Sequence, residues 1–328
     1  MAFSSVFDFA PAEWLPLQDR ELVDRMGQMQ IEDLQGKNFE NPDFEARVVY
    51  DVRNYFATDL FQRILMSDKE DKQLVIILPS PENQVFISVA ENLNKFNVSC
   101  RNVQVFFLYE YANEKGDVAP WGSPYSRSGH FMRYFYNRVN PELRMPMENI
   151  HFWTKENVET YSDEIAAFGG ADVAYTELSW SGSIGAIEYA GFPTDSMEEF
   201  LQMGSRYVTL ELEHQAHDSL RGMFGCSGDI ANVPPCAVTI GPKDIAAAKY
   251  RVDVEYLSAC GGSPSLQLFP LKLALAGPIM PINPGSMLRL FPGICYIAES
   301  VAKSGLKRPD NPWLIDKLEE IRKQEEEA

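Results

Sequence analysis

The sequence predicts an α/β protein in which helices cover both faces of a mostly parallel, Rossmann-like sheet, giving three layers. Short runs of apolar and β-branched residues alternate along the chain with helical patterns. An uninterrupted apolar run such as Leu74–Leu78 (LVIIL) is typical of a strand that is covered on both faces. Buried strands that alternate with helices favour parallel βαβ units. Hydrophobic residues make up 45% of the 328 positions, which is ample for a sizeable core.

The elements can be assigned in order along the chain. Residues 44–65 repeat apolar side chains at helical spacing and predict the first core helix. The predicted strands are 74–78, 103–108, 150–153, 171–175, 207–212, 237–240, 252–258 and 294–297. The other predicted helices are 85–96, 129–139, 157–168, 242–250 and 266–276, and a proline opens the helix at 242 in its first turn.

We expect one domain over residues 44–305. Residues 1–43 are polar, acidic and interrupted by prolines and a glycine, as in an extension laid over a core. The charged tail 306–328, which ends in KLEEIRKQEEEA, predicts a solvated helix. No internal repeat or low-complexity linker divides the sequence.

Composition excludes several classes of function. A net charge of −18 without a Lys/Arg cluster argues against nucleic-acid binding. No run approaches the ~18 apolar residues of a membrane span, and the N-terminus lacks the pattern of a signal peptide. Five cysteines without a CxxC pair indicate reduced, buried thiols. We therefore expect a cytoplasmic protein with no nucleic-acid or membrane partner.

Ligand sites in parallel α/β sheets lie beyond the carboxyl ends of the strands. This rule singles out four loops, at 79–84, 109–111, 179–188 and 261–265. The sequence around these loops is similar to one known family over four segments in the same order. The segments are YSDEIAAFGGADVAYTELSWSGSIGAIE (161–188), QVFFLYEYA (104–112), PMENIHFW (146–153) and NVPPCAVTIG (232–241).

The chain resembles the glucosamine-6-phosphate deaminase/isomerase family, and more loosely the 6-phosphogluconolactonases, from about Asp59 to about Glu299. The resemblance implies a fold of the deaminase type. It also implies a Gly-rich phosphate turn, an Asp that abstracts the C2 proton, and a His backed by Asp and Glu that opens the sugar ring. An Arg and a Lys complete the phosphate site of that family.

Carried onto this sequence, most of these functional positions hold other residue types. The phosphate turn falls on 80–84 (SPENQ), where Pro81 lacks an N–H and Glu82 adds negative charge. Glu82 equally suits the start of a helix. The proton-abstracting Asp falls on Tyr109, a poor base at its usual pKa of ~10, and an aromatic there could simply pack in the core.

The ring-opening segment keeps only one acid/base group. The family's Asp and His fall on Ser181 and Ser183, and its Glu is retained as Glu188. The Lys position falls near Ser265, so its charge is lost. The pair His214 and His217 has no third ligand at a telling spacing, so we expect no metal and no cofactor.

Candidate site residues follow from these placements and from the segment LEHQAHDSLRG (212–222), which roughly matches the family's His-Asp-x-Arg region and adds His217 and Arg221. The catalytic candidates are Glu188, Glu110 and His217. The ligand-binding candidates are Ser80, Asn83, Tyr109, Ser181, Ser183, Arg221, Gly262 and Ser263.

Two functions remain open on the sequence. One is an enzyme of carbohydrate metabolism that isomerises, deaminates or hydrolyses a sugar or sugar phosphate with altered chemistry. The alternative is a non-catalytic relative that binds a sugar-like ligand or serves a regulatory or structural role. The resemblance also implies a possible homo-oligomer.

Overall fold

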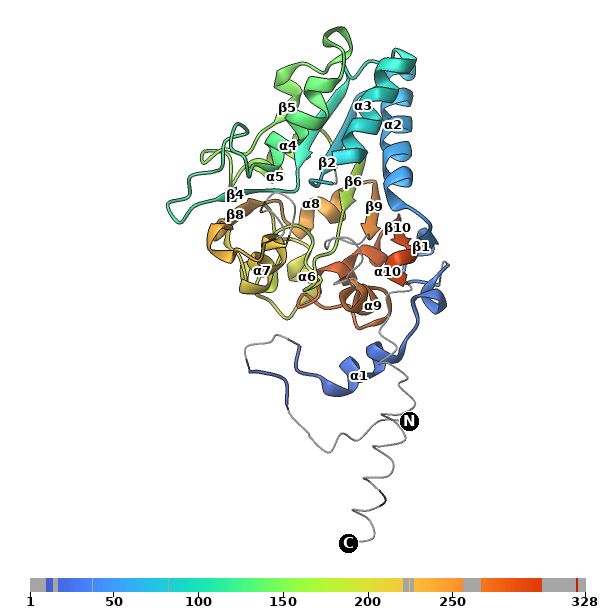
Figure 1. The fold of residues 1–328 in the computed structure, drawn as a ribbon, viewed down its shortest axis with the longest axis vertical. Coiled ribbons are helices and arrows are strands. Elements are labelled where there is room, and N and C mark those ends of the chain that lie inside the picture. The colour runs from blue at the N-terminus through green and yellow to red at the C-terminus, as the bar shows by residue number, and fades with distance from the viewer. Residues whose placement is uncertain are drawn as a thin grey trace.

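A seven-stranded, wholly parallel sheet forms the centre of the protein (Figure 1). The computed structural model describes residues 10–13, 17–36, 38–81, 83–220, 224, 227–255, 267–302 and 323. The strand order is β1-β10-β9-β6-β2-β3-β5. The strands are β1 (Phe44–Val49), β2 (Leu74–Leu78), β3 (Val103–Phe107), β5 (Ile150–His151), β6 (Val173–Thr176), β9 (Tyr250–Glu255) and β10 (Gly293–Ala298).

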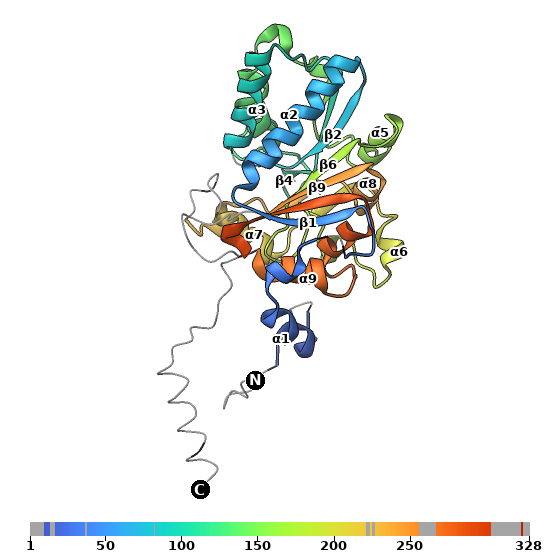
Figure 2. The same ribbon diagram turned by 90° about the vertical axis from the view of Figure 1, so that its right-hand side faces the viewer.

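Helices cover both faces of this sheet, with α2 and α3 on one side and α5 and α8 on the other (Figure 2). The predicted three-layer α/β fold is therefore confirmed. The helices are α1 (Arg20–Gln28), α2 (Val52–Glu70), α3 (Asn83–Phe96), α4 (Arg127–Tyr134), α5 (Tyr161–Ala167), α6 (Met197–Phe200), α7 (Leu212–Ser219), α8 (Pro242–Ala247), α9 (Leu268–Ala276) and α10 (Glu299–Ala302).

The start of the core differs from the sequence prediction. Residues 44–49 form strand β1, which pairs in parallel with β10, so the helix predicted over 44–65 is wrong for this part. Asp51 separates the two elements, because its carboxylate accepts the N–H of Arg53 and caps the first turn of α2. The apolar side chains that seemed to continue one helical face therefore belong to two elements.

A second, antiparallel sheet of three strands lies beyond the carboxyl end of β3. It contains β4 (Tyr109–Ala112), β8 (Cys236–Thr239) and β7 (Arg206–Thr209) in that order. Leu108 alone separates β3 from β4, and it joins both sheets: its N–H donates to Leu78 O and its carbonyl accepts from Ile240 N, each at 3.0 Å. The loop predicted at 109–111 is therefore a strand.

The described part of residues 1–43 packs on the core at two places. Helix α9 is apolar on all sides, a pattern typical of a helix buried on every face. Leu22 and Met26 of α1 cover it by packing against Leu273. Further along, Gly36 exchanges two backbone hydrogen bonds with Ala46 at the outer edge of β1.

The remaining expectations concern the C-terminal tail, membrane spans and the cysteines. Apart from Lys323, the tail predicted as a charged helix (306–328) lies outside the described residues. Among the helices that the structure describes, none is long and apolar enough to cross a membrane. The cysteines Cys100, Cys236 and Cys295 are buried free thiols.

Candidate functional site

A small pocket lies where the parallel strands end, as expected for this class of sheet. Strand β2 leads into Ser80, β3 into Tyr109, and β6 into Glu177 and Ser179. The described residues leave a free volume of about 30 Å³. The pocket is lined by Pro79, Ser80, Leu108, Tyr109, Arg127, Glu177, Ser179, Gly185, His214, His217 and Asp218.

Helix α7 supplies three of these residues from one face. His214, His217 and Asp218 stand at positions i, i+3 and i+4, which bring side chains together on the surface of a helix. All three side chains are buried, and His217 stacks on Trp180 with ring centroids 5.6 Å apart. The spacing in LEHQAHDS therefore gathers two imidazoles and a carboxyl group at the pocket.

His214 lies between two carboxylates. Its Nδ1 donates to Glu188, and its Nε2 lies 3.1 Å from Asp218 Oδ2. The second oxygen of Glu188 accepts the N–H of Glu211 at 2.8 Å. Burial alone would lower the pKa of His214, but the two carboxylates raise it to about 10. The ring is therefore a cation at neutral pH and donates from both nitrogens.

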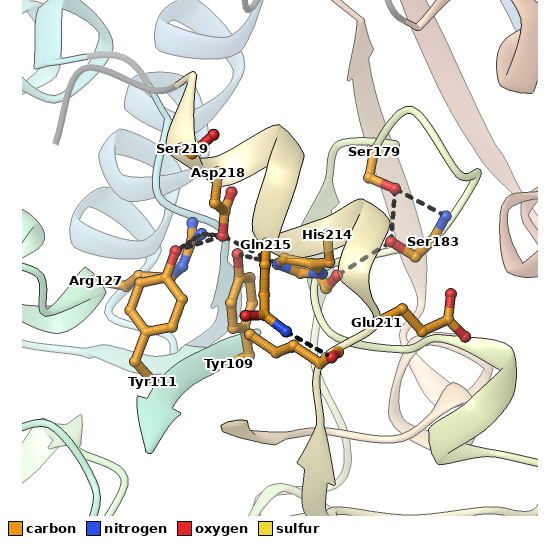
Figure 3. Close-up of polar contacts among 12 residues, drawn as sticks. Tyr109, Tyr111, Arg127, Ser179, Ser183, Glu211, His214, Gln215, Asp218 and Ser219 are labelled. Atoms are coloured by element: carbon orange, nitrogen blue, oxygen red, sulfur yellow. Dashed lines mark hydrogen bonds and ion pairs between the residues drawn. The ribbon is translucent and has the colours of Figure 1, made fainter. Parts of the chain in front are cut away.

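Asp218 is the centre of a second group of contacts (Figure 3). The Tyr111 hydroxyl donates to Asp218 Oδ2, and Arg127 Nη2 lies 3.2 Å from the same oxygen. Complete burial raises the pKa of Tyr111 well above its usual value, so this hydroxyl keeps its proton. Negative and positive side chains thus alternate within one buried cluster, in the order Glu188, His214, Asp218 and Arg127.

Tyr109 lies beside these residues and lines the pocket. Its oxygen lies 3.4 Å from His214 Nε2, and the Arg127 guanidinium lies 3.9 Å from the centre of its ring. Since His214 is itself protonated, the proton of Tyr109 is directed elsewhere, which suits donation to a ligand.

Glu110 has a different position from the one expected of a proton-transfer group. Successive strand residues face opposite ways, so Glu110 points away from the side of β4 that carries Tyr109. Its carboxylate accepts backbone N–H groups from Tyr111, Arg127 and Ser128, and the hydroxyls of Ser126 and Ser128, at 2.7–3.0 Å. Glu110 does not line the pocket; it fixes the start of α4 and so positions Arg127.

The remaining predicted residues divide into four groups. Ser80 and His217 line the pocket. Ser181 and Ser183 lie behind Ser179, with hydroxyl oxygens 2.9 and 2.7 Å from its hydroxyl. Asn83 Oδ1 contacts His130 Nε2 at the start of α3 and lies outside the pocket lining. Arg221, Gly262 and Ser263 lie outside the described residues.

Five residues that line the site were not among the sequence candidates: Asp218, Arg127, Glu177, Ser179 and His214. The first could have been found, because His-x-x-His-Asp at helical spacing places Asp218 beside His214. Glu177 and Ser179 stand directly after a predicted strand, where the strand-end rule applies. Arg127 had no such signal, because only the folding of α4 onto β4 brings it to Tyr109.

A second buried polar cluster lies behind the pocket wall and contains only acids. Glu255 Oε1 accepts the N–H of Leu178 at 3.0 Å, and Asp253 Oδ1 accepts from the Thr176 hydroxyl at 2.6 Å. Burial, followed by mutual repulsion, raises the pKa of Glu255 well above its usual value, and burial also raises that of Asp253. Glu255 Oε2 has no donor among the described residues, and a proton held by the pair satisfies it.

Metal coordination finds no support in the part of the chain that the structure describes. Within it, no group of three His, Cys, Asp or Glu side chains is arranged to hold an ion. His214, the one imidazole with both nitrogens in contact with carboxylates, is protonated and therefore has no lone pair for a metal.

Comparison with known proteins supports the fold. No protein-family model matches the sequence. A monomeric glucosamine-6-phosphate deaminase is 19% identical, with a TM-score of 0.61 over 80% of this chain and 99% of that one. The 6-phosphogluconolactonases of Thermotoga maritima and Trypanosoma brucei are 11% and 14% identical. Their TM-scores are 0.54 and 0.53, over 78% and 80% of this chain and 99% and 98% of theirs.

The chain therefore has the fold shared by glucosamine-6-phosphate deaminase and 6-phosphogluconolactonase. The resemblance inferred from the four sequence segments is confirmed at the level of the fold. At these identities the chemistry of the site has to be argued from the residues that this chain places there.

Proposed function

We propose that this chain is an enzyme that opens or isomerises the ring of a sugar-type compound by proton transfer. The observation that carries the proposal is the buried contact series from Glu188 through His214 to the Tyr109 hydroxyl, which ends in the pocket. A buried carboxylate–imidazolium pair behind a hydroxyl is a recurrent way to deliver and recover protons. Its position at the strand ends is where this fold binds ligands.

The proposed ring opening breaks one C–O bond and transfers two protons, without any change of oxidation state. Tyr109 gives its proton to the ring oxygen as the bond from that oxygen to the anomeric carbon breaks. A base takes the proton of the anomeric hydroxyl, and a carbonyl forms. Glu177, whose carboxyl group lines the same pocket, is our candidate for this base. His214 then returns a proton to Tyr109 across 3.4 Å. The cycle closes when Glu177 releases its proton to water and His214, whose cationic form Glu188 stabilises, takes one up.

Two further points favour sugar chemistry. The solved structures with this fold include a glucosamine-6-phosphate deaminase and 6-phosphogluconolactonases, whose names refer to sugar phosphates. The resemblance also implied a His backed by Asp and Glu, and here His214 of α7 has Glu188 and Asp218 as its partners. We propose that this rebuilt group replaces the histidine that the resemblance places at Ser183. The buried free thiols favour a reducing, cytoplasmic location.

One observation favours the non-catalytic alternative as a second candidate. The free volume of about 30 Å³ holds two or three water molecules by volume, because Tyr109 and Arg127 stack across the pocket. A protein that only senses a sugar would bind a ligand group there without changing it. Binding without turnover is the result that would favour this candidate.

The test begins with a thermal-shift screen over aldoses, ketoses, amino sugars, lactones and their phosphate esters. Each hit is then followed by proton NMR, which measures exchange between anomers and incorporation of deuterium at C2. We expect acceleration by the natural chain and a loss of at least a hundredfold in Tyr109→Phe. Tyr207→Phe is the matched control, because that exposed tyrosine donates to the backbone oxygen of Asn113 and lies outside the pocket lining. Equal rates in Tyr109→Phe and Tyr207→Phe would contradict the proposal.

A further inference from the structure

We propose that the Ser179 hydroxyl is a further ligand-binding group, which donates a hydrogen bond to the anomeric oxygen of the sugar-type substrate. The inference rests on the proposed function and adds a residue to its site. Three features of the described residues carry it. Ser179 lines the pocket together with Glu177, its oxygen is held by two backbone N–H groups, and its proton is the part that remains for a ligand.

Ser179 and Glu177 belong to one extended segment that leaves strand β6 at the pocket. Leu178, the residue between them, forms an antiparallel bridge with Ile184 and is buried in the hydrophobic core. Side chains two positions apart in an extended chain face the same way, and both Glu177 and Ser179 line the pocket. A carboxyl group and a hydroxyl group therefore lie on the same side of this segment.

The oxygen of Ser179 is fixed by the turn that follows it (Figure 3). Its Oγ accepts the N–H groups of Ser181 and Ser183, each at 3.2 Å. The backbone closes the same turn, because the Ser179 N–H donates to Ser183 O at 3.0 Å and the Gly182 N–H donates to Ser179 O at 3.1 Å. The position of the hydroxyl oxygen is thus set by the chain itself.

These contacts make Ser179 a donor toward any ligand. A serine hydroxyl has two oxygen lone pairs and one O–H, and the two backbone N–H groups occupy both lone pairs. The O–H has two neighbouring acceptors, Ser183 Oγ at 2.7 Å and Ser181 Oγ at 2.9 Å. A hydroxyl hydrogen rotates to suit its acceptor, so it can turn from a neighbouring serine to a ligand oxygen and exchange one hydrogen bond for another.

The proposed ring opening supplies such an acceptor. The anomeric oxygen gives its proton to Glu177 and becomes a carbonyl oxygen, while the bond from the anomeric carbon to the ring oxygen breaks. A donor held beside an oxygen that carries developing charge stabilises the transition state. Glu177 and Ser179 together provide an acceptor and a donor, which match the two hydrogen-bonding roles of one hydroxyl group. A protonated amino group at the same place would have no lone pair for Ser179.

The test is a thermodynamic cycle between Ser179 and one ligand atom. Hexoses, hexosamines and their phosphate esters serve as probes, each paired with the analogue that carries hydrogen in place of the anomeric hydroxyl. Isothermal titration calorimetry measures both affinities for the full chain and for its Ser179→Ala variant. We expect loss of the anomeric hydroxyl to weaken binding at least tenfold in the natural chain. The factor should be at least threefold smaller in Ser179→Ala, because one of the two hydrogen bonds is already gone.

Two further variants separate this contact from a general effect on folding. Ser162→Ala is the matched control, because it removes a buried hydroxyl that accepts the backbone N–H of Ser205 and lies outside the pocket lining. It should keep the full effect of the anomeric hydroxyl. Ser179→Cys keeps the shape of the side chain but donates weakly, so it should behave like Ser179→Ala.

The outcomes distinguish this inference from the proposed function. An undiminished effect of the anomeric hydroxyl in either Ser179 variant would overturn the inference and leave the proposed function standing. Failure of every probe to bind the natural chain would overturn both.

Discussion

Two buried polar clusters lie on either side of the pocket wall, and they differ in how their charges are balanced. In the cluster of Glu188, His214, Asp218 and Arg127, anions and cations alternate. The pair Asp253 and Glu255 contains only acids and holds protons instead. The first cluster touches the pocket, whereas the second supports the backbone of Leu178 behind it. The alternating cluster therefore places charged side chains beside a ligand in the pocket, whereas the acid pair has a structural role.

The largest expected effect comes from removing His214, one of the two cations of the alternating cluster. His214→Leu keeps a similar volume but leaves Glu188 and Asp218 buried without their shared partner. Breaking a buried ion pair in this way costs about 3–5 kcal/mol of the free energy of unfolding, which urea denaturation at pH 7 measures. In the double variant His214→Leu/Glu188→Leu the loss should be smaller, since fewer charges remain uncompensated. A loss below about 1 kcal/mol in the single variant would contradict the ion-pair description.

The pH dependence of stability distinguishes the two clusters next. The folded-state pKa of His214 is raised from 6.5 to about 10, so its stabilisation is complete below pH 6.5 and is lost as pH rises through about 10. The loss should be on the order of a few kcal/mol, and it should be absent from His214→Leu. Denaturation curves at intervals between pH 6 and pH 10 measure it. An identical slope in both proteins would assign the effect to other groups.

Tyr111→Phe should have a smaller effect within the same cluster. The change deletes one of three donors to Asp218 Oδ2 and leaves His214 and Arg127 in place. A hydrogen bond to a charged group contributes about 1.5–3 kcal/mol, and the remaining donors should hold the loss near the lower value. Thermal unfolding monitored by calorimetry is a suitable measurement. A loss as large as that of His214→Leu would mean that the hydroxyl, rather than the cation, holds the cluster together.

Glu255→Gln should have the smallest effect, and in the opposite direction. The raised pKa of Glu255 means that the folded protein loses stability as pH rises above about 4.3, the usual value of an unfolded glutamate. Glutamine supplies a donor without a titratable proton, so the variant should gain about 1 kcal/mol at pH 7 and nothing at pH 4. Urea denaturation at the two pH values tests this. A loss at pH 7 would show that Glu255 is ionised and has a partner.

Sequence patterns predicted most strands of the central sheet but only part of the site. Uninterrupted apolar runs such as Leu74–Leu78 marked the buried parallel strands, because a strand covered on both faces needs no polar alternation. Strand β1 was mistaken for helix because Val48, Val49 and Val52 also fit a helical face. Strands β7 and β8 were predicted, but their pairing in an antiparallel sheet was missed because the third strand, β4, is only four residues long and follows β3 almost directly.

Within the site, Glu188 was found because its spacing in the Ser179–Glu188 loop matched a known motif. Its partner could not be found in the same way. His214 comes from α7, and only the pairing of β4 with β8 and of β8 with β7 brings that helix back to the loop. Arg127 depends in turn on Glu110, whose carboxylate accepts four hydrogen bonds from residues 126–128 at the start of α4. Such relations arise from tertiary structure and leave no local pattern.

The central claim is that His214 is a cation at neutral pH and lies behind the Tyr109 hydroxyl. Nitrogen-15 NMR of the imidazole groups tests it most directly, because the chain has four histidines and His214→Leu identifies the relevant signals. The account predicts that both ring nitrogens of His214 are protonated at pH 8 and lose a proton only near pH 10. A neutral ring at pH 8, with a titration near pH 6.5, would contradict it.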